Sequence, residues 1–342
     1  MSGGMSLGSE SGEHGKRRVI GIDLGGTKLA GGVVSEDLVV HHRAHRFSRG
    51  ADQQAVLDRL VEVVEELRVQ NGDEQPIEAV GLGIPCLIDQ ASGSAVMAVN
   101  LPLEDVPIRD LMSERLGLPV MIDNDANVAA LAEQRFGAGK GKRDVVLLTL
   151  GTGVGGGIVL DGKVFRGSSG AGAELGHIVV DADGPRCQGS CPNHGCLETF
   201  VSGTALARDA LALATAKPDS QLGKLLAEGR DISGVLITEL AFDGDADAIE
   251  ILREAGEYLG VGITSLVNIF NPEVVVVGGG AAAAGDLLLK PAREVLATRG
   301  LRPSRDQAQI VPAHFGAEAG MLGAAVLAMD ACFADGAPTE TH

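Results

Sequence analysis

The stretch Val19-Ile-Gly-Ile-Asp-Leu-Gly-Gly-Thr-Lys28 decides the fold, because its pattern occurs a second time in the chain. The first copy is an apolar strand, a glycine turn and a second strand that runs on to Val34. Residues 145–159 repeat strand, glycine turn and strand, and Gly25 and Gly151 lie 126 residues apart. Each copy is followed by a helical stretch and a further strand. This duplication predicts two related α/β domains that face one another across a cleft.

Both turns carry features that suit phosphate. Paired glycines let the backbone approach a ligand closely, although alone they would indicate only a tight hairpin turn. The Asp, Thr and Lys around the first pair favour phosphate, and two such turns on opposite walls would hold a nucleotide between them. A third glycine turn follows a buried strand at 273–277. Because glycines have no side chains, an adenine or ribose could lie directly against the backbone there. The candidate nucleotide-binding residues are Asp23, Gly25, Gly26, Thr27, Lys28, Gly151, Thr152, Gly153, Gly278, Gly279 and Gly280.

The bulk composition excludes several classes of protein. A chain of 342 residues is long enough for two domains of roughly 150 residues each, and 45% hydrophobic residues can fill their cores. The net charge of −18 argues against a nucleic-acid partner, which needs clustered Lys and Arg. No apolar run approaches the roughly 20 residues that cross a membrane. With five cysteines and no signal peptide, we expect a cytoplasmic, reducing environment.

The expected domain boundaries follow from these patterns. Residues 1–16 are rich in Gly, Ser and Glu and predict a disordered tail. Residues 17–124, together with about 317–335, predict a small α/β domain, and residues 125–316 a large α/β domain. The strands expected in the small domain include one at Leu38 to Phe47.

A cluster of cysteines within the large domain predicts a metal site. His177, Cys187, Cys191 and Cys196 supply three thiolates and one imidazole, a set typical of tetrahedral zinc. Four protein ligands leave no open position, so the zinc is expected to be structural. Unliganded thiols or a disulfide between the first two cysteines are the alternatives. Glu174 and Glu198 bracket the cluster, although a structural zinc site does not require them.

Two polar segments follow expected strands and are candidates for substrate binding. Asp123-Asn-Asp-Ala-Asn127 begins a helix, where Asp125 suits the N-cap. A carboxylate at the carboxyl end of an interior strand is also where the sites of α/β proteins tend to lie. Asn100 lies at a strand-to-loop edge, where its amide is either a hydroxyl ligand or a turn residue.

Taken in order, these motifs resemble the ROK family of bacterial sugar kinases and repressors, and most closely its glucokinases, from about residue 18 to 330. The resemblance implies an actin-like, ribonuclease-H-like pair of domains with sugar and ATP in the cleft. It implies phosphorylation of the 6-hydroxyl of glucose by ATP, the entry step of glycolysis, with Asp125 as general base. Mg²⁺ would bridge the phosphates near Asp23, and the assembly would be a homodimer or homotetramer. The implied sugar ligands are Asn100, Asn124, Asp125, Glu174, His177 and Glu198, and the implied zinc ligands are His177, Cys187, Cys191 and Cys196.

Two departures from the family pattern bear on these expectations. The usual Cys-x-Cys pair is here Cys187-Gln-Gly-Ser-Cys191, which is two residues longer. The usual glycine after Gly-x-Pro is here Cys86, which either narrows the pocket or is neutral.

Several alternatives stay open. The sugar is glucose, or another hexose such as fructose or an N-acetylhexosamine, and polyphosphate is an alternative donor. A sugar-sensing repressor is a further alternative, although residues 1–16 are too short and too rich in Gly and Ser for a helix-turn-helix.

Overall fold

The computed structural model describes residues 16–26, 28–47, 52–73, 75–98 and 101–333. Its framework is a pair of five-stranded mixed sheets with the same strand order. The first sheet has the order β3-β2-β1-β4-β8, and the second β11-β10-β9-β12-β13. In both sheets an antiparallel hairpin lies beside parallel strands, so the duplicated sequence unit folds into a duplicated sheet.

The first sheet begins with the hairpin of the first glycine turn. Its strands are β1 (Arg18–Leu24), β2 (Lys28–Ser35), β3 (Val40–Phe47), β4 (Ile77–Ile84) and β8 (Val120–Asn124). A separate three-stranded sheet follows β4 and consists of β5 (Cys86–Asp89), β6 (Ser94–Ala98) and β7 (Glu104–Val106). The expected third strand starts two residues later than predicted. Leu38 has a φ of 65°, a left-handed turn conformation that a strand cannot contain.

The second sheet consists of β9 (Val145–Leu150), β10 (Val154–Leu160), β11 (Lys163–Val164), β12 (Val274–Gly278) and β13 (Gln309–Pro312). Helices cover one of its faces and form the largest apolar core. They are α4 (Glu198–Val201), α5 (Gly203–Ala216), α6 (Gln221–Ala227), α7 (Gly234–Phe242), α8 (Ala246–Phe270), α9 (Asp286–Arg299) and α10 (Ser304–Gln307). Three 3-10 turns, at Leu175–His177, Gly280–Ala284 and Gly316–Glu318, complete this part of the chain.

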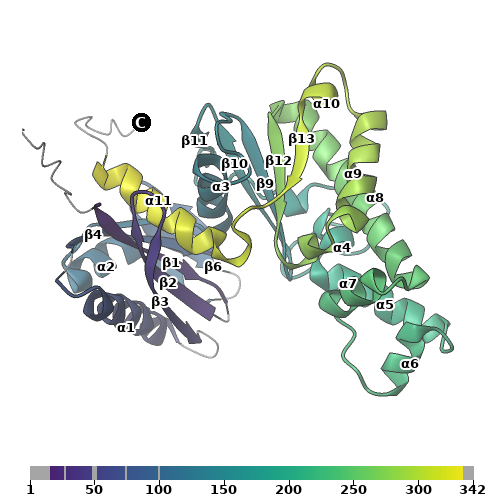
Figure 1. Ribbon diagram of the computed structural model, residues 1–342, viewed down its shortest axis with the longest axis horizontal. Coiled ribbons are helices and arrows are strands. Elements are labelled where there is room, and N and C mark those ends of the chain that lie inside the picture. The colour runs from purple at the N-terminus through teal and green to yellow at the C-terminus, as the bar shows by residue number, and fades with distance from the viewer. Residues whose placement is uncertain (1–15, 27, 48–51, 74, 99–100, 334–342) are drawn as a thin grey trace, which may run out of the picture.

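Two helices lie between the sheets and set their separation (Figure 1). One face of the first sheet is covered by α1 (Gln53–Asn71) and α2 (Ile108–Leu116). Its other face packs on α11 (Ala319–Phe333), and α11 packs on α3 (Asp125–Arg135), which lies against the second sheet. Because α3 is enclosed on both sides, nine of its eleven residues are buried. Asp125 therefore begins a helix held between the two sheets.

The segment Gly316–Phe333, which contains α11, has the length and composition of a membrane span, with a mean hydropathy of 1.3. Within the described part of the chain it is the one helix of this kind. More than half of it is buried against the first sheet and α3, as expected for a core helix.

Candidate active site

Three carboxylates from three segments converge where β1 and β8 end. Asp23 lies in β1, Asp125 directly follows β8, and both strands are parallel to β4, so these ends meet at one edge of the first sheet. Glu174 comes from the second half of the chain, at the start of the Leu175–His177 turn. The charge of Glu174 raises the pKa of Asp125, and the charge of Asp125 raises the pKa of Asp23. The three side chains therefore share one electrostatic environment.

The helix cap at this edge differs from the prediction. Asn124, and not Asp125, is the N-cap of α3, and its side-chain oxygen accepts from the backbone N–H groups of Ala126 at 2.9 Å and Asn127 at 3.3 Å. Asp125 is the first helical residue, and its Oδ1 also accepts from Ala126 at 2.9 Å. The amide oxygen of Asn124 thus serves the helix, which leaves its amide nitrogen for a ligand or for the Cys86 carbonyl at 3.5 Å.

Burial is the main influence on the acid–base chemistry of this edge. Desolvation raises the pKa of Asp125 above its ordinary value, the charge of Glu174 adds to the rise, and the N–H of Ala126 opposes it. Desolvation, with a smaller effect of Asp125, raises the pKa of Asp23 to about 7. Cys86 is 6% exposed. Burial and the charge of Asp125 raise the pKa of the Cys86 thiol to about 12, so this thiol is uncharged beside the Asp125 carboxylate.

We expect Asp23 to give the ligand-free protein a pH-dependent stability. Its pKa is about 7 when folded and 3.8 ordinarily, so between these values the folded chain retains a proton that the unfolded chain has released. This contribution is fully present below about pH 4 and is lost as the pH rises to about 7. Thermal melts of Mg²⁺-free protein should therefore show a flatter profile across this window for Asp23→Asn than for wild type. Profiles of equal slope would contradict the assignment.

The four predicted zinc ligands converge, as a closed metal site requires. The ligand atoms of His177, Cys187, Cys191 and Cys196 all lie within 4.8 Å of one another. Nδ1 of His177 is 3.4 Å from Sγ of Cys187, and Sγ of Cys191 is 3.9 Å from Sγ of Cys196. Ligand atoms around tetrahedral zinc are separated by about 3.5–3.8 Å, so the set fits this ion.

A small hairpin accommodates the longer Cys187–Cys191 spacing. The N–H of Cys187 donates to the Asn193 carbonyl at 2.9 Å, and Arg186 and His194 form an antiparallel bridge. The additional residues form the tip of this hairpin, where Gly189 has a φ of 60°. The insertion therefore leaves the ligand atoms together.

Glu198 links the cysteine cluster to the second glycine turn. One carboxylate oxygen, Oε2, accepts from the N–H of Val154 at 2.8 Å, and the other lies 3.9 Å from Sγ of Cys187. A Cβ at Gly153 would lie 2.4 Å from Oε2, so a larger residue here would displace the Glu198 carboxylate. The N–H of Gly203 also donates to the Gly151 carbonyl at 2.7 Å. Hydrogen bonds from Glu198 and Gly203 thus fix the turn, while Gly151 and Thr152 stay exposed.

The other predicted nucleotide residues lie at the ends of strands. The N–H of Gly25 donates to the carbonyl of Lys28 at 2.8 Å, which closes the first turn, and the Lys28 side chain is exposed. Gly278 ends β12, and Gly279 and Gly280 are exposed beyond it. The predictions for Thr27 and Asn100 lie outside the described residues.

Sequence reasoning missed an ion pair beside Asp125. Arg166 follows β11 and reaches Asp123, where its Nη2 lies 2.6 Å from Oδ2. Asp123 lies in β8 of the first sheet, whereas Arg166 lies in the segment after β11 of the second. The two residues are 43 positions apart, and no motif in the sequence marks their contact. Only the strand-end position of Asp123 could have indicated it.

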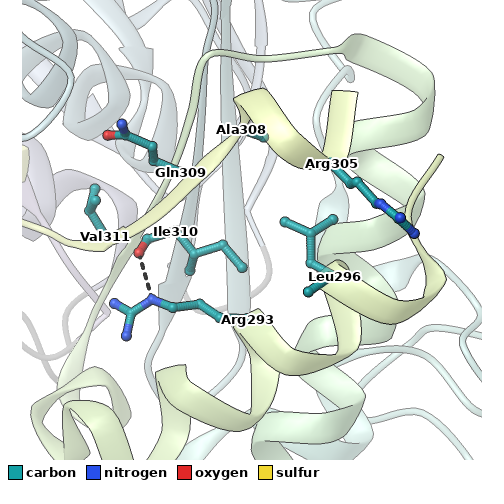
Figure 2. A pocket seen from close by; sticks show the side chains of 8 residues that line it. Arg293, Leu296, Arg305, Ala308, Gln309, Ile310 and Val311 are labelled. Atoms are coloured by element: carbon teal, nitrogen blue, oxygen red, sulfur yellow. Dashed lines mark hydrogen bonds between the residues drawn. The ribbon is translucent and has the colours of Figure 1, made fainter. Parts of the chain in front are cut away.

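A cavity of about 430 Å³ lies away from these groups, against α9, α10 and β13 (Figure 2). None of the predicted site residues lines it. Arg293 uses its Nε to bind the Ile310 carbonyl at 3.0 Å and its Nη1 to bind Asp286 at 2.7 Å. Arg305, the other arginine that lines the cavity, lies 3.5 Å from the Asp306 carboxylate, so both charges are already paired.

Comparisons with known proteins agree with this arrangement. The sequence profile of the ROK family matches residues 19–331. A glucokinase from Streptomyces coelicolor is 38% identical over 318 residues, which cover 91% of this chain and 97% of the relative. A xylose repressor from Caldicellulosiruptor bescii is 35% identical, over 82% of this chain and 70% of the repressor.

Among solved structures, a ROK family glucokinase from Streptomyces griseus, in complex with glucose and AMPPNP, superimposes with a TM-score of 0.79. It is 37% identical, and the match covers 92% of this chain and 99% of that one. The similarity confirms the predicted fold class, an actin-like, ribonuclease-H-like pair of α/β units.

Proposed function

This chain belongs to the ROK family, and we propose that it transfers the γ-phosphoryl group of ATP to the 6-hydroxyl of glucose. The observation that carries the proposal is the convergence of Asp125, Glu174 and Asp23 beside a glycine turn that Glu198 holds. Phosphoryl transfer needs alignment, charge neutralisation and a base near the attacking hydroxyl, rather than covalent chemistry by the protein. This site contains groups for each task.

Asp125 is the proposed general base. Its Oδ1 is engaged by the helix N-terminus, which leaves Oδ2 to accept the proton of the sugar hydroxyl. A pKa above the usual carboxylate range makes it a stronger base than an exposed Asp. Asn100, Asn124, Glu174, His177 and Glu198 are the proposed ligands of the remaining sugar hydroxyls. Because Nδ1 of His177 faces Cys187, its Nε2 is the nitrogen left for a hydroxyl.

The glycine turns are the proposed phosphate cradle. Backbone N–H groups at glycine turns suit anionic oxygens. The turn at Gly151 is exposed and Gly25 is partly exposed, and the turn from Gly278 suits the nucleoside. Mg²⁺ would neutralise phosphate charge, and Asp23 is the carboxylate proposed to help hold it. Zn²⁺, held by the histidine and the three cysteines, would have no catalytic position and would fix the segment between Glu174 and Glu198.

Other features stay predictions. These are the small domain of 17–124 with 317–335, the large domain of 125–316, a homodimer or homotetramer, a cytoplasmic location, a role at the entry of glycolysis, and the lack of a nucleic-acid partner.

One coupled assay tests the function. A panel of glucose, fructose, mannose and N-acetylated hexosamines would be crossed with ATP, ADP and polyphosphate. The proposal expects the highest kcat/KM for glucose with ATP, and another preferred hexose or donor would replace that part of the assignment. Sugar binding without transfer to any hexose would favour the sensing role that the repressor relative suggests.

A further inference from the structure

An ion pair joins the two sheets directly beside the proposed base. Arg166 comes from the segment after β11, and Asp123 lies near the end of β8. Nε of Arg166 donates to Oδ2 of Asp123 at 2.8 Å, and Nη2 lies 2.6 Å from the same oxygen. The Asp123 side chain is only 2% exposed, so this charge interaction is poorly screened by solvent.

The second oxygen of Asp123 organises the start of α3. Oδ1 accepts from the backbone N–H of Asn124 at 2.8 Å and from the side-chain amide of Asn127 at 3.1 Å. Asp125 lies between these two donors in sequence. The Asp123 carboxylate therefore holds the residues on both sides of the proposed base, while Arg166 holds the carboxylate from the opposite sheet.

The loop that carries Arg166 closes on itself and packs against the first half of the chain. The N–H of Gly172 donates to the Arg166 carbonyl at 2.9 Å, which closes the loop. At Gly170, φ is 82° and a Cβ would lie 2.0 Å from the carbonyl oxygen of Ile88 in β5, so only glycine fits there. Glu174 follows two residues after the loop closes. The loop thus runs from a contact with the first half of the chain directly to a proposed sugar ligand.

From these contacts we propose that Arg166 is a positioning residue for phosphoryl transfer, whose ion pair with Asp123 sets Asp125, at the start of α3, against Glu174, which follows the Arg166 loop. This inference rests on the proposed kinase function. Arginine suits the task better than lysine because two of its N–H groups reach one oxygen in a fixed geometry. A misplacement of about 1 Å at reacting groups can reduce a rate by about 100-fold, so the effect belongs mainly in kcat.

The experiment compares Arg166→Met, Arg166→Lys, Asp123→Asn and the double variant Asp123→Asn/Arg166→Met. We expect kcat with glucose to fall roughly 10- to 100-fold for Arg166→Met, with the Kd for ATP nearly unchanged and partial rescue in Arg166→Lys. Arg166→Met also leaves a buried carboxylate unpaired and should lower Tm. The double variant has no unpaired charge and should regain much of that Tm, while its kcat stays low.

Arg143→Met is the matched control, since Arg143 forms an exposed pair with Asp161, which lies in the turn of the β10–β11 hairpin that leads to Arg166. Its kcat and Tm should match wild type. A double variant whose kcat recovers together with Tm, or an Arg166→Met protein with wild-type kcat, would overturn the inference alone. If Arg166→Met does not fold, the test is the kcat of Arg166→Lys, provided that its Tm equals that of wild type. A reduced kcat would support the inference, and a wild-type kcat would overturn it. A wild-type protein that phosphorylates no sugar would overturn the proposed function and this inference with it.

Discussion

Asp125→Asn is expected to lose most of its turnover and still bind glucose. The substitution keeps the size of the side chain and an oxygen for the N–H of Ala126, so α3 should begin as in wild type. It removes the group that would accept the proton of the attacking hydroxyl. General base catalysis typically contributes about 10²–10⁴-fold, and kcat should fall by that amount. The assay follows kcat with glucose and ATP, with the glucose Kd measured by calorimetry.

The matched control for this substitution is Asp110→Asn. Asp110 also lies in the first turn of a helix, α2, but its side chain is 71% exposed. Asp110→Asn loses a negative charge near a helix N-terminus, which costs a few tenths to about 1 kcal/mol of stability at most. Asp125→Asn should not incur this cost, because burial already disfavours the charge of Asp125 in the folded protein. Only Asp125→Asn should therefore lose activity. An Asp125→Asn enzyme with wild-type kcat would end the assignment of Asp125 as the base.

The duplicated fold was predictable because its signals are local. Apolar strands on both sides of a glycine turn, at 19–34 and 145–159, identify the two hairpins from neighbouring residues alone. The two observed sheets have the same strand order. The cysteine cluster was predictable for the same reason, since its ligands lie within twenty residues of one another. The longer spacing between Cys187 and Cys191 did not matter, because the hairpin absorbs the additional residues at its tip.

The features that the sequence did not reveal depend on long-range contacts or on small competing energies. Asn124 and Asp125 are adjacent and have nearly equal N-cap preferences, so propensity could not choose between them. The bond between Glu198 and the Val154 N–H joins residues 44 positions apart, and only the folded chain shows that the cysteine cluster supports the second glycine turn.

That contact determines what we expect when the cluster is broken by Cys196→Ser. Cys196 is fully buried, and its strand bridge to Val179 holds the segment that leads to Glu198. Bound zinc should fall from one ion per chain to a minor fraction. Tm should fall, because a structural zinc ion contributes its binding free energy to folding. The glucose Kd should rise roughly 10- to 100-fold, the size of effect that disturbed metal surroundings typically have on affinity or activity, because His177 and Glu198 would no longer be held in place.

The nucleotide should be affected less than the sugar. His177 and Glu198 are proposed to contact glucose directly, whereas the cluster reaches the phosphate turn only through the bond from Glu198 to Val154. We therefore expect the Kd for ATP to rise by a smaller factor than the Kd for glucose. Cys332→Ser is the matched control, since this cysteine lies on α11 outside the cluster, and it should retain zinc and both affinities. Equal losses of glucose and ATP affinity in Cys196→Ser would mean that the zinc stabilises the whole domain rather than the sugar-binding residues alone. Wild-type protein that is active without bound zinc would contradict the proposed zinc site.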